Sequence, residues 1–82
     1  MVGSRGAAIR IRLFASLRER AGWSERPWPI EPATTAAQVW DQLALGVDRS
    51  RVRIAVNQVF AAADQPLQPG DELAFLPPIS GG

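Results

Sequence analysis

The chain has 82 residues, of which 46% are hydrophobic and 21% charged, a balance typical of one small globular domain. Its nine basic residues and eight carboxylates give a net charge of +1 with the signs interspersed, which argues against nucleic acid as a partner. Cysteine and histidine are absent, which excludes disulfides, zinc sites of the usual ligand type, and thiol or serine–histidine catalysis. We therefore expect no bound metal and no self-contained enzyme.

No apolar run approaches the roughly 18 residues that cross a bilayer, so we expect no membrane partner. Residues 1–8 contain no hydrophobic stretch of signal-peptide length, which favours a cytoplasmic chain. We divide the sequence into a flexible leader (1–8), one folded domain (9–76) and an extended tail (77–82).

A strand, a short helix and a proline-rich segment open the expected domain. Residues 9–14 alternate between apolar and polar side chains, which predicts a half-buried strand. Residues 16–21 can form a short helix that points Leu17 inward and ends at Gly22. The segment 23–32 contains three prolines, and proline cannot donate to a ladder, so any strand there must lie at a sheet edge.

The main helix is expected after a capping box. The hydroxyl of Thr35 can accept from the backbone N–H of Gln38, whose side chain reaches back to the backbone of Thr35. Apolar residues then recur at helical spacing, which predicts an amphipathic helix that ends at Gly46. The residues of this face are Ala36, Val39, Trp40 and Leu43. We interpret Trp40 as a core residue.

The second half of the chain contains strand patterns separated by turns. Residues 52–56 alternate as a strand, Asn57 and Gln58 suggest a tight turn, and 59–62 would form a short return strand. Residues 68–71 have the proline and glycine of a type II turn before a last strand at 72–76. These elements predict an α+β domain with the helix across one face of the sheet and the first and last strands paired in parallel.

Three large apolar residues interrupt the alternation. Phe14, Phe60 and Leu76 all point away from the expected helix. The pattern leaves two explanations open, an error in the strand phase or an exposed apolar patch that docks a partner protein.

The chain closes on a segment that combines stiffness with a narrow end. Its residues are Pro77, Pro78, Ile79, Ser80, Gly81 and Gly82. Two prolines favour an extended exit from the last strand, and the four residues beyond them can span about 14 Å. Glycine has no Cβ, so such an end can enter a channel only a backbone wide. The alternative is a glycine-ended terminus without a role.

A terminal carboxylate reacts only after activation, most simply as an acyl-adenylate. A sulfur nucleophile then gives a thiocarboxylate, as in a sulfur carrier, and an amine gives an amide, as in a protein modifier. The sequence contains no nucleotide-binding loop, so we expect the activating enzyme to be supplied in trans.

The closing thirteen residues, Gly70–Gly82, resemble those of the small subunits of molybdopterin synthase. Asn57-Gln58, Pro66-Leu67 and the opening segment Phe14–Glu19 are also similar to that family. The likeness runs from about residue 9 to the end of the chain. It implies a ubiquitin-like β-grasp fold: a mixed sheet, one main helix across one face, and a flexible C-terminal Gly-Gly tail.

The resemblance also implies a mechanism centred on the carboxylate of Gly82. An ATP-dependent adenylating enzyme of the E1 kind would activate it, and a sulfur donor protein would make the thiocarboxylate (1-thioglycine). The tail would then donate sulfur to cyclic pyranopterin monophosphate inside the large subunit of molybdopterin synthase, within a heterotetramer. This chain would bind no cofactor, because the activating enzyme uses the ATP and the large subunit carries the catalytic side chains.

The same resemblance assigns roles to particular residues. The tail residues that enter the partner would be Pro77, Pro78, Ile79, Ser80, Gly81 and the reacting Gly82. The apolar docking surface for the large subunit would consist of Phe14, Phe60 and Leu76.

Other functions remain open at this point. One is a related β-grasp sulfur carrier for thiamine, cysteine or tRNA thiolation, although the family's thiamine carrier usually lacks the Phe-Leu-Pro-Pro type of approach to the tail. Another is a ubiquitin-like protein modifier, and the absence of lysine argues weakly against its forming chains. A third is a β-grasp binding module whose glycines are incidental.

Overall fold

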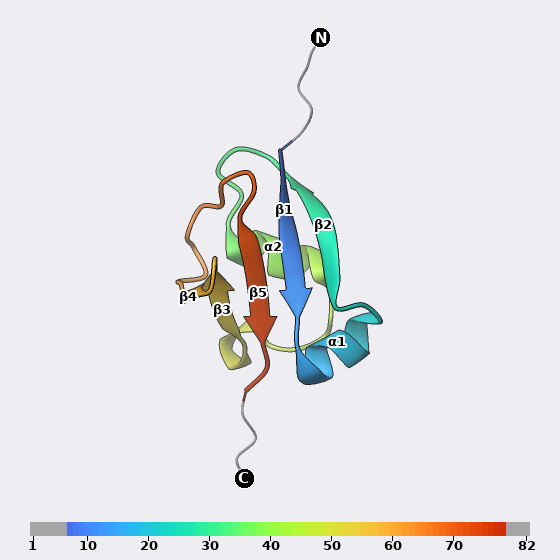
Figure 1. The fold of residues 1–82 in the computed structure, drawn as a ribbon. Coiled ribbons are helices and arrows are strands. Elements are labelled where there is room, and N and C mark those ends of the chain that lie inside the picture. The colour runs from blue at the N-terminus through green and yellow to red at the C-terminus, as the bar shows by residue number, and fades with distance from the viewer. Residues whose placement is uncertain (1–6, 79–82) are drawn as a thin grey trace.

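The centre of the fold is a pair of parallel strands, and a helix crosses one face of their sheet (Figure 1). This computed structural model describes residues 7–78. Its elements are, in chain order, β1 (Ala7–Leu13), α1 (Ala15–Ala21), β2 (Glu25–Ile30), α2 (Ala36–Leu43), the 3₁₀ helix η1 (Arg49–Arg51), β3 (Arg53–Val56), β4 (Val59–Phe60) and β5 (Glu72–Leu76). Within residues 7–78 the sheet has five strands in the order β2-β1-β5-β3-β4, with only β1 and β5 parallel. The predicted α+β architecture is confirmed.

The first strand begins at Ala7, two residues before the expected start of the domain. Ala7 and Ala8 pair with Ile30 and Pro29 of β2, and the carbonyl of Ala8 accepts from the N–H of Gly70 at 2.8 Å. The sequence placed any strand in residues 23–32 at a sheet edge but gave no register for it, so the pairing of these two alanines was not expected. The rest of the expected leader, residues 1–6, lies outside the described residues.

The second strand lies at the edge of the sheet, as its prolines predict. Pro27 and Pro29 pair with Arg10 and Ala8. The N–H of Arg10 donates to Asp71 beside β5 at 2.9 Å, so the nitrogen of Pro27, directly opposite Arg10, faces away from β1. Because this edge lacks donors at both prolines, it offers a poor template for another strand.

The core lies between α2 and the sheet face that it covers. Ile11, Leu73 and Phe75 have no exposed surface, and the ring of Trp40 lies 4.9 Å from that of Phe75. Trp40 is 4% exposed, and its indole N–H donates to the carbonyl of Val47 at 3.2 Å. The interpretation of Trp40 as a core residue is therefore confirmed.

The main helix ends earlier than the sequence predicts. It stops at Leu43, and Ala44 adopts the left-handed conformation at φ 51°, so the expectation that Gly46 terminates it was wrong. A left-handed non-glycine residue costs about 1–2 kcal/mol, which a glycine would avoid. The hydrogen bond from Trp40 to Val47 holds the following loop against the helix. This side-chain contact, which the spacing of apolar residues does not indicate, favours the earlier end.

The capping box at the start of α2 gives a first testable prediction. The N–H of Gln38 donates to the hydroxyl of Thr35 at 3.2 Å, and the N–H of Thr35 donates to the Gln38 side chain at 2.9 Å, as predicted. We expect Thr35→Ala to lower the free energy of unfolding by about 1 kcal/mol, measured by denaturant titration. Thr35→Ser keeps the hydroxyl and serves as the control. Equal losses in both variants would contradict a capping role.

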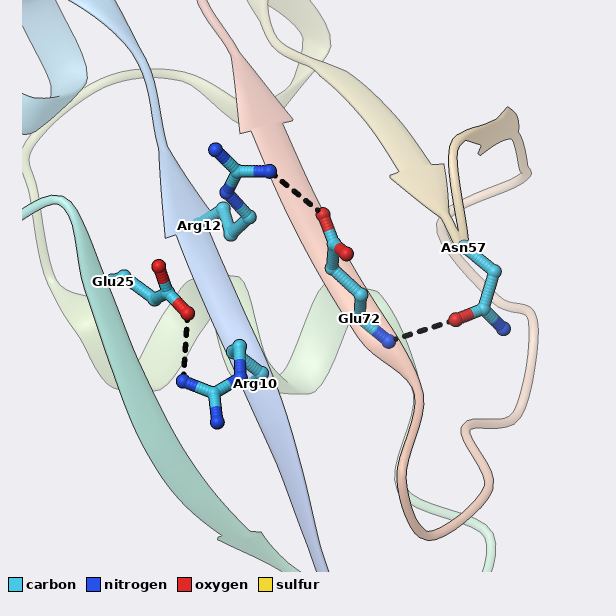
Figure 2. A network of polar contacts seen from close by, with 5 residues as sticks. All are labelled: Arg10, Arg12, Glu25, Asn57 and Glu72. Carbon is cyan, nitrogen blue, oxygen red and sulfur yellow. Dashed lines mark hydrogen bonds and ion pairs between the residues drawn. The ribbon is translucent and has the colours of Figure 1, made fainter.

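Asn57 ties the β3–β4 turn to the start of β5 (Figure 2). Asn57 and Gln58 have φ values of 53° and 71°, which confirms the predicted tight turn. The side-chain oxygen of Asn57 accepts from the N–H of Glu72 at 3.0 Å, and its amide donates to Asp71 at 2.9 Å. These bonds fix the position of β5 relative to the short β3–β4 hairpin.

Two short elements differ from the expected pattern. β4 comprises only Val59–Phe60, because the carbonyl of Ala62 already closes a turn with the N–H of Gln65 at 3.2 Å. η1 was not predicted, and it begins after Asp48, whose carboxylate accepts from the N–H of Ser50 at 3.0 Å. The chain therefore reaches β3 through a tight polar turn that the apolar pattern did not indicate.

Candidate functional site

The sheet face opposite α2 carries a shallow hollow of about 320 Å³. Phe14, Phe60 and Leu76, the three apolar residues singled out from the sequence, all line it. Phe60 is 65% exposed, whereas Phe14 and Leu76 are half-buried. Their outward position is real and does not result from an error in the strand phase.

Two alanines make this face hollow. Ala55 of β3 and Ala74 of β5 lie directly opposite each other, and both are 7% exposed. Ala55 also pairs with Phe60, whose ring therefore stands at the rim beside a small neighbour. The period-two alternation places Ala55 and Ala74 on this face, but only the strand register brings them together as the floor. Sequence reasoning did not identify them as site residues.

Arginine side chains cover two of the aromatic rings at the rim. The guanidinium carbon of Arg12 lies 5.2 Å from the ring centroid of Phe14, and that of Arg53 lies 4.9 Å from Phe60. Arg12 also donates to Glu72 at 3.2 Å (Figure 2). Contacts of this kind are worth about 0.5–1 kcal/mol at exposed sites, so they orient the rings without closing the hollow.

The tail leaves the fold at the rim of this hollow. β5 ends at Leu76, which lines the hollow, and half-buried Pro77 and exposed Pro78 follow. The other predicted tail residues, Ile79, Ser80, Gly81 and Gly82, lie outside the described residues. The structure thus describes where the tail begins and which surface lies beside that point.

The polar groups of residues 7–78 form no group of three or more that could hold a metal ion. Hydrogen bonds from Ser50, and then the charges of Arg51 and Arg49, hold the pKa of the Asp48 carboxyl group below its usual value. Its charged form is therefore favoured by folding, and that small stabilisation is lost as the pH falls through the lowered pKa.

None of the described helices is both long and apolar enough to span a membrane.

Comparison with known proteins agrees with this architecture. The crystal structure of small archaeal modifier protein 1 from H. volcanii is similar with a TM-score of 0.77 and 26% identity, covering 90% of this chain and 100% of that one. The mixed sheet crossed by a helix is thus a ubiquitin-like β-grasp fold. The chain belongs to the ThiS family, which matches residues 11–82.

Curated relatives make the family resemblance more specific. A protein of Escherichia coli named "Molybdopterin synthase sulfur carrier subunit" is 36% identical over 81 residues, covering 90% of this chain and 99% of the relative. A human protein of the same name is 33% identical over 82 residues, covering 90% and 93%. The resemblance derived from the closing residues is confirmed.

Proposed function

We propose that this chain is the sulfur-carrier subunit of a molybdopterin synthase and that its reacting group is the C-terminal carboxylate of Gly82. The observation that carries the proposal is the match to relatives of that name along nearly their whole length, together with a family match that extends through Gly82. The exit of the tail beside an apolar hollow supports it, because a carrier must present its end while docked.

The chemistry takes place in two stages at one carboxylate. In the first, the Gly82 carboxylate attacks the α-phosphorus of ATP on the adenylating enzyme and releases pyrophosphate. A sulfur nucleophile then displaces AMP; where the donor is a persulfide, a thiol must reduce the new sulfur–sulfur bond. The product is a thiocarboxylate in which one oxygen has become sulfur. Because the chain contains neither cysteine nor histidine, the sulfur and the catalytic groups come from its partners.

In the second stage the thiocarboxylate donates its sulfur to cyclic pyranopterin monophosphate in the large subunit. Docking on the hollow holds Pro77 and Pro78, which we call the tail root, in place while the glycine end of the tail enters the pocket of the large subunit. Burying an exposed phenylalanine such as Phe60 stabilises a complex by about 1.5–3 kcal/mol, enough to matter for affinity. The function of this chain is therefore positioning and delivery, in the cytoplasm where these partners would meet.

A single-turnover reaction tests the destination of the sulfur. Thiocarboxylated chain is mixed with the large subunit and cyclic pyranopterin monophosphate, and the pterin product is measured by mass spectrometry. The two sulfurs of a dithiolene require two carriers per product, so we expect one molybdopterin formed for each two thiocarboxylates consumed. Thiocarboxylate that persists in this mixture but is consumed by a thiamine- or tRNA-thiolating system would contradict the assignment.

A protein modifier is the second candidate, because small archaeal modifier protein 1 shares the fold at 26% identity. A modifier ends as an amide on a target amine, whereas a carrier returns its carboxylate after each cycle. Amide-linked conjugates of this chain in cell extracts, resistant to thiols and hydroxylamine, would favour the modifier.

A further inference from the structure

A second surface beside the tail root is charged rather than apolar. Arg49 and Arg51 lie in η1, and Arg53 opens β3 directly opposite Leu76 of β5. A shallow hollow of about 380 Å³ is lined by Pro78 and by residues 50–53. In Figure 1, η1 is the unlabelled yellow coil at the end of the sheet where β5 leads into the tail. We name Arg49, Arg51 and Arg53 the arginine collar.

Positive charge is concentrated in the collar, whereas the rest of the chain is close to neutral. Residues 48–53 contain three arginines and one aspartate, so this segment carries +2 while the whole chain carries +1. Asp48 is already engaged by the N–H and hydroxyl of Ser50, at 3.0 and 2.9 Å. The ion pairs among residues 7–78 are made by Arg10 and Arg12, so the collar has no carboxylate within ion-pair distance in the described structure.

The collar is continuous with the docking hollow. Arg53 belongs to the collar, and its guanidinium also lies over the ring of Phe60 at 4.9 Å. A partner that covers Phe60 must therefore remove water from Arg53 as well. Removing water from an unpaired charge opposes binding, so a partner that covers this rim stably must supply carboxylates.

A nucleotide is a poorer match for the collar than a protein surface. A tail inserted into an active site is extended, which would place the Gly82 carboxylate up to about 14 Å beyond Pro78. Phosphates attached at that carboxylate would lie too far away for the collar, of which Arg51 and Arg53 line a hollow with Pro78. The groups that meet the collar are therefore those that rim the entrance of the tail pocket.

We propose that the arginine collar pairs with carboxylates at the rim of the tail pocket of the large subunit, and that this pairing steers association before the tail enters. The inference rests on the proposed function, since it assigns chemistry to the partner of the same docking face. Complementary charge at a rim acts mainly on the association rate and makes it depend on salt. The tail chemistry after docking does not depend on the collar.

Association kinetics with the large subunit test the collar. For the wild-type chain we expect the association rate constant to fall about 10-fold between 50 and 500 mM salt. The double variant Arg49→Gln/Arg51→Gln, whose residues do not line the docking hollow, should associate about 3- to 10-fold more slowly at 50 mM and show a flatter salt dependence. Arg49→Lys/Arg51→Lys keeps the charge and should associate at close to the wild-type rate.

The matched control removes two charges elsewhere. Arg20 of α1 and Arg26 of β2 are also exposed and line one hollow together, and Arg26 lies over Trp23 at 4.6 Å much as Arg53 lies over Phe60. The sheet order places β2 on the far side of β1 and β5 from the collar. Arg20→Gln/Arg26→Gln should therefore retain the wild-type association rate within about 2-fold. An equal loss in this control and in the collar variant would overturn the proposal.

Two further outcomes separate this inference from the proposed function. If the wild-type chain binds the large subunit and transfers sulfur while the collar variant associates at the wild-type rate, the collar proposal fails alone. If the wild-type chain neither binds nor transfers sulfur, the proposed function fails. A slower rate seen only with the adenylating enzyme would overturn the assignment of the collar to the large subunit.

Discussion

Deleting Gly82 is expected to abolish sulfur transfer and to leave the fold unchanged. The deletion moves the carboxylate back by one residue, about 3.3–3.6 Å, inside a pocket that must place it against a nucleotide and then a pterin. Misplacement by 1 Å can already cost about 100-fold in rate, so we expect a loss of at least that size in adenylation and transfer. Both rates are measured with the isolated activating enzyme and large subunit.

Ser80→Ala provides the control for this deletion. It changes a tail side chain but keeps the length of the tail, so the rates should stay within a few-fold of wild type. Thermal unfolding of the deleted chain should match that of the wild type, because the last strand, β5, already ends at Leu76. A deleted chain that still carries sulfur, or one that unfolds, would show that the tail has another role.

Phe60→Asp is expected to weaken binding to the large subunit by at least about 100-fold. The variant loses about 1.5–3 kcal/mol of apolar burial and places a charge in the interface. Phe60 is 65% exposed, so the stability of the isolated chain should change by no more than about 0.5–1 kcal/mol. Titration calorimetry gives the affinity, and denaturant titration gives the stability.

Val59→Asp is the matched control for that substitution. Val59 is 68% exposed and adjoins Phe60 in β4, yet it does not line the hollow. The same change at this position should leave the affinity nearly unchanged. Equal losses at the two positions would mean that β4 as a whole, rather than the hollow, contacts the partner. An unfolded Phe60→Asp chain would mean that the ring supports the fold.

Much of the fold could be predicted because its signals are local. The capping box at Thr35, the left-handed terminator Gly22 and the turn at Asn57 all take the expected geometry. The type II turn also holds, since Gly70 has φ 86° and the N–H of Asp71 donates to Gln68 at 3.1 Å. Each of these features depends on neighbours in the chain, so a short sequence window contains what determines it.

The features that differed depend on contacts that the apolar pattern does not show. The early end of α2 is held by a hydrogen bond from the indole of Trp40 to Val47, and the start of β1 at Ala7 depends on its register against β2. The proposed docking surface shows the same division. Alternation indicated its apolar rim, but the floor needs the register of Ala55 against Ala74.

The arginine collar shows how an overall composition can conceal a local surface. Arg49, Arg51 and Arg53 occupy alternate positions in the sequence, but the net charge of only +1 for the whole chain does not indicate a basic surface. Their position beside the tail root follows from the pairing of β3 with β5, in which Arg53 lies opposite Leu76. The position of these charges beside the tail therefore could be inferred only from the sheet order.

The central claim, that the end of this chain carries sulfur, is tested most directly by the intact mass. The chain is incubated with the adenylating enzyme, ATP and a sulfur donor, and then weighed by mass spectrometry beside a sample without ATP. We expect a gain of about 16 Da, the exchange of one oxygen for sulfur, located in the C-terminal peptide and absent from the chain that lacks Gly82. An unchanged mass, or a gain located elsewhere in the chain, would contradict the account.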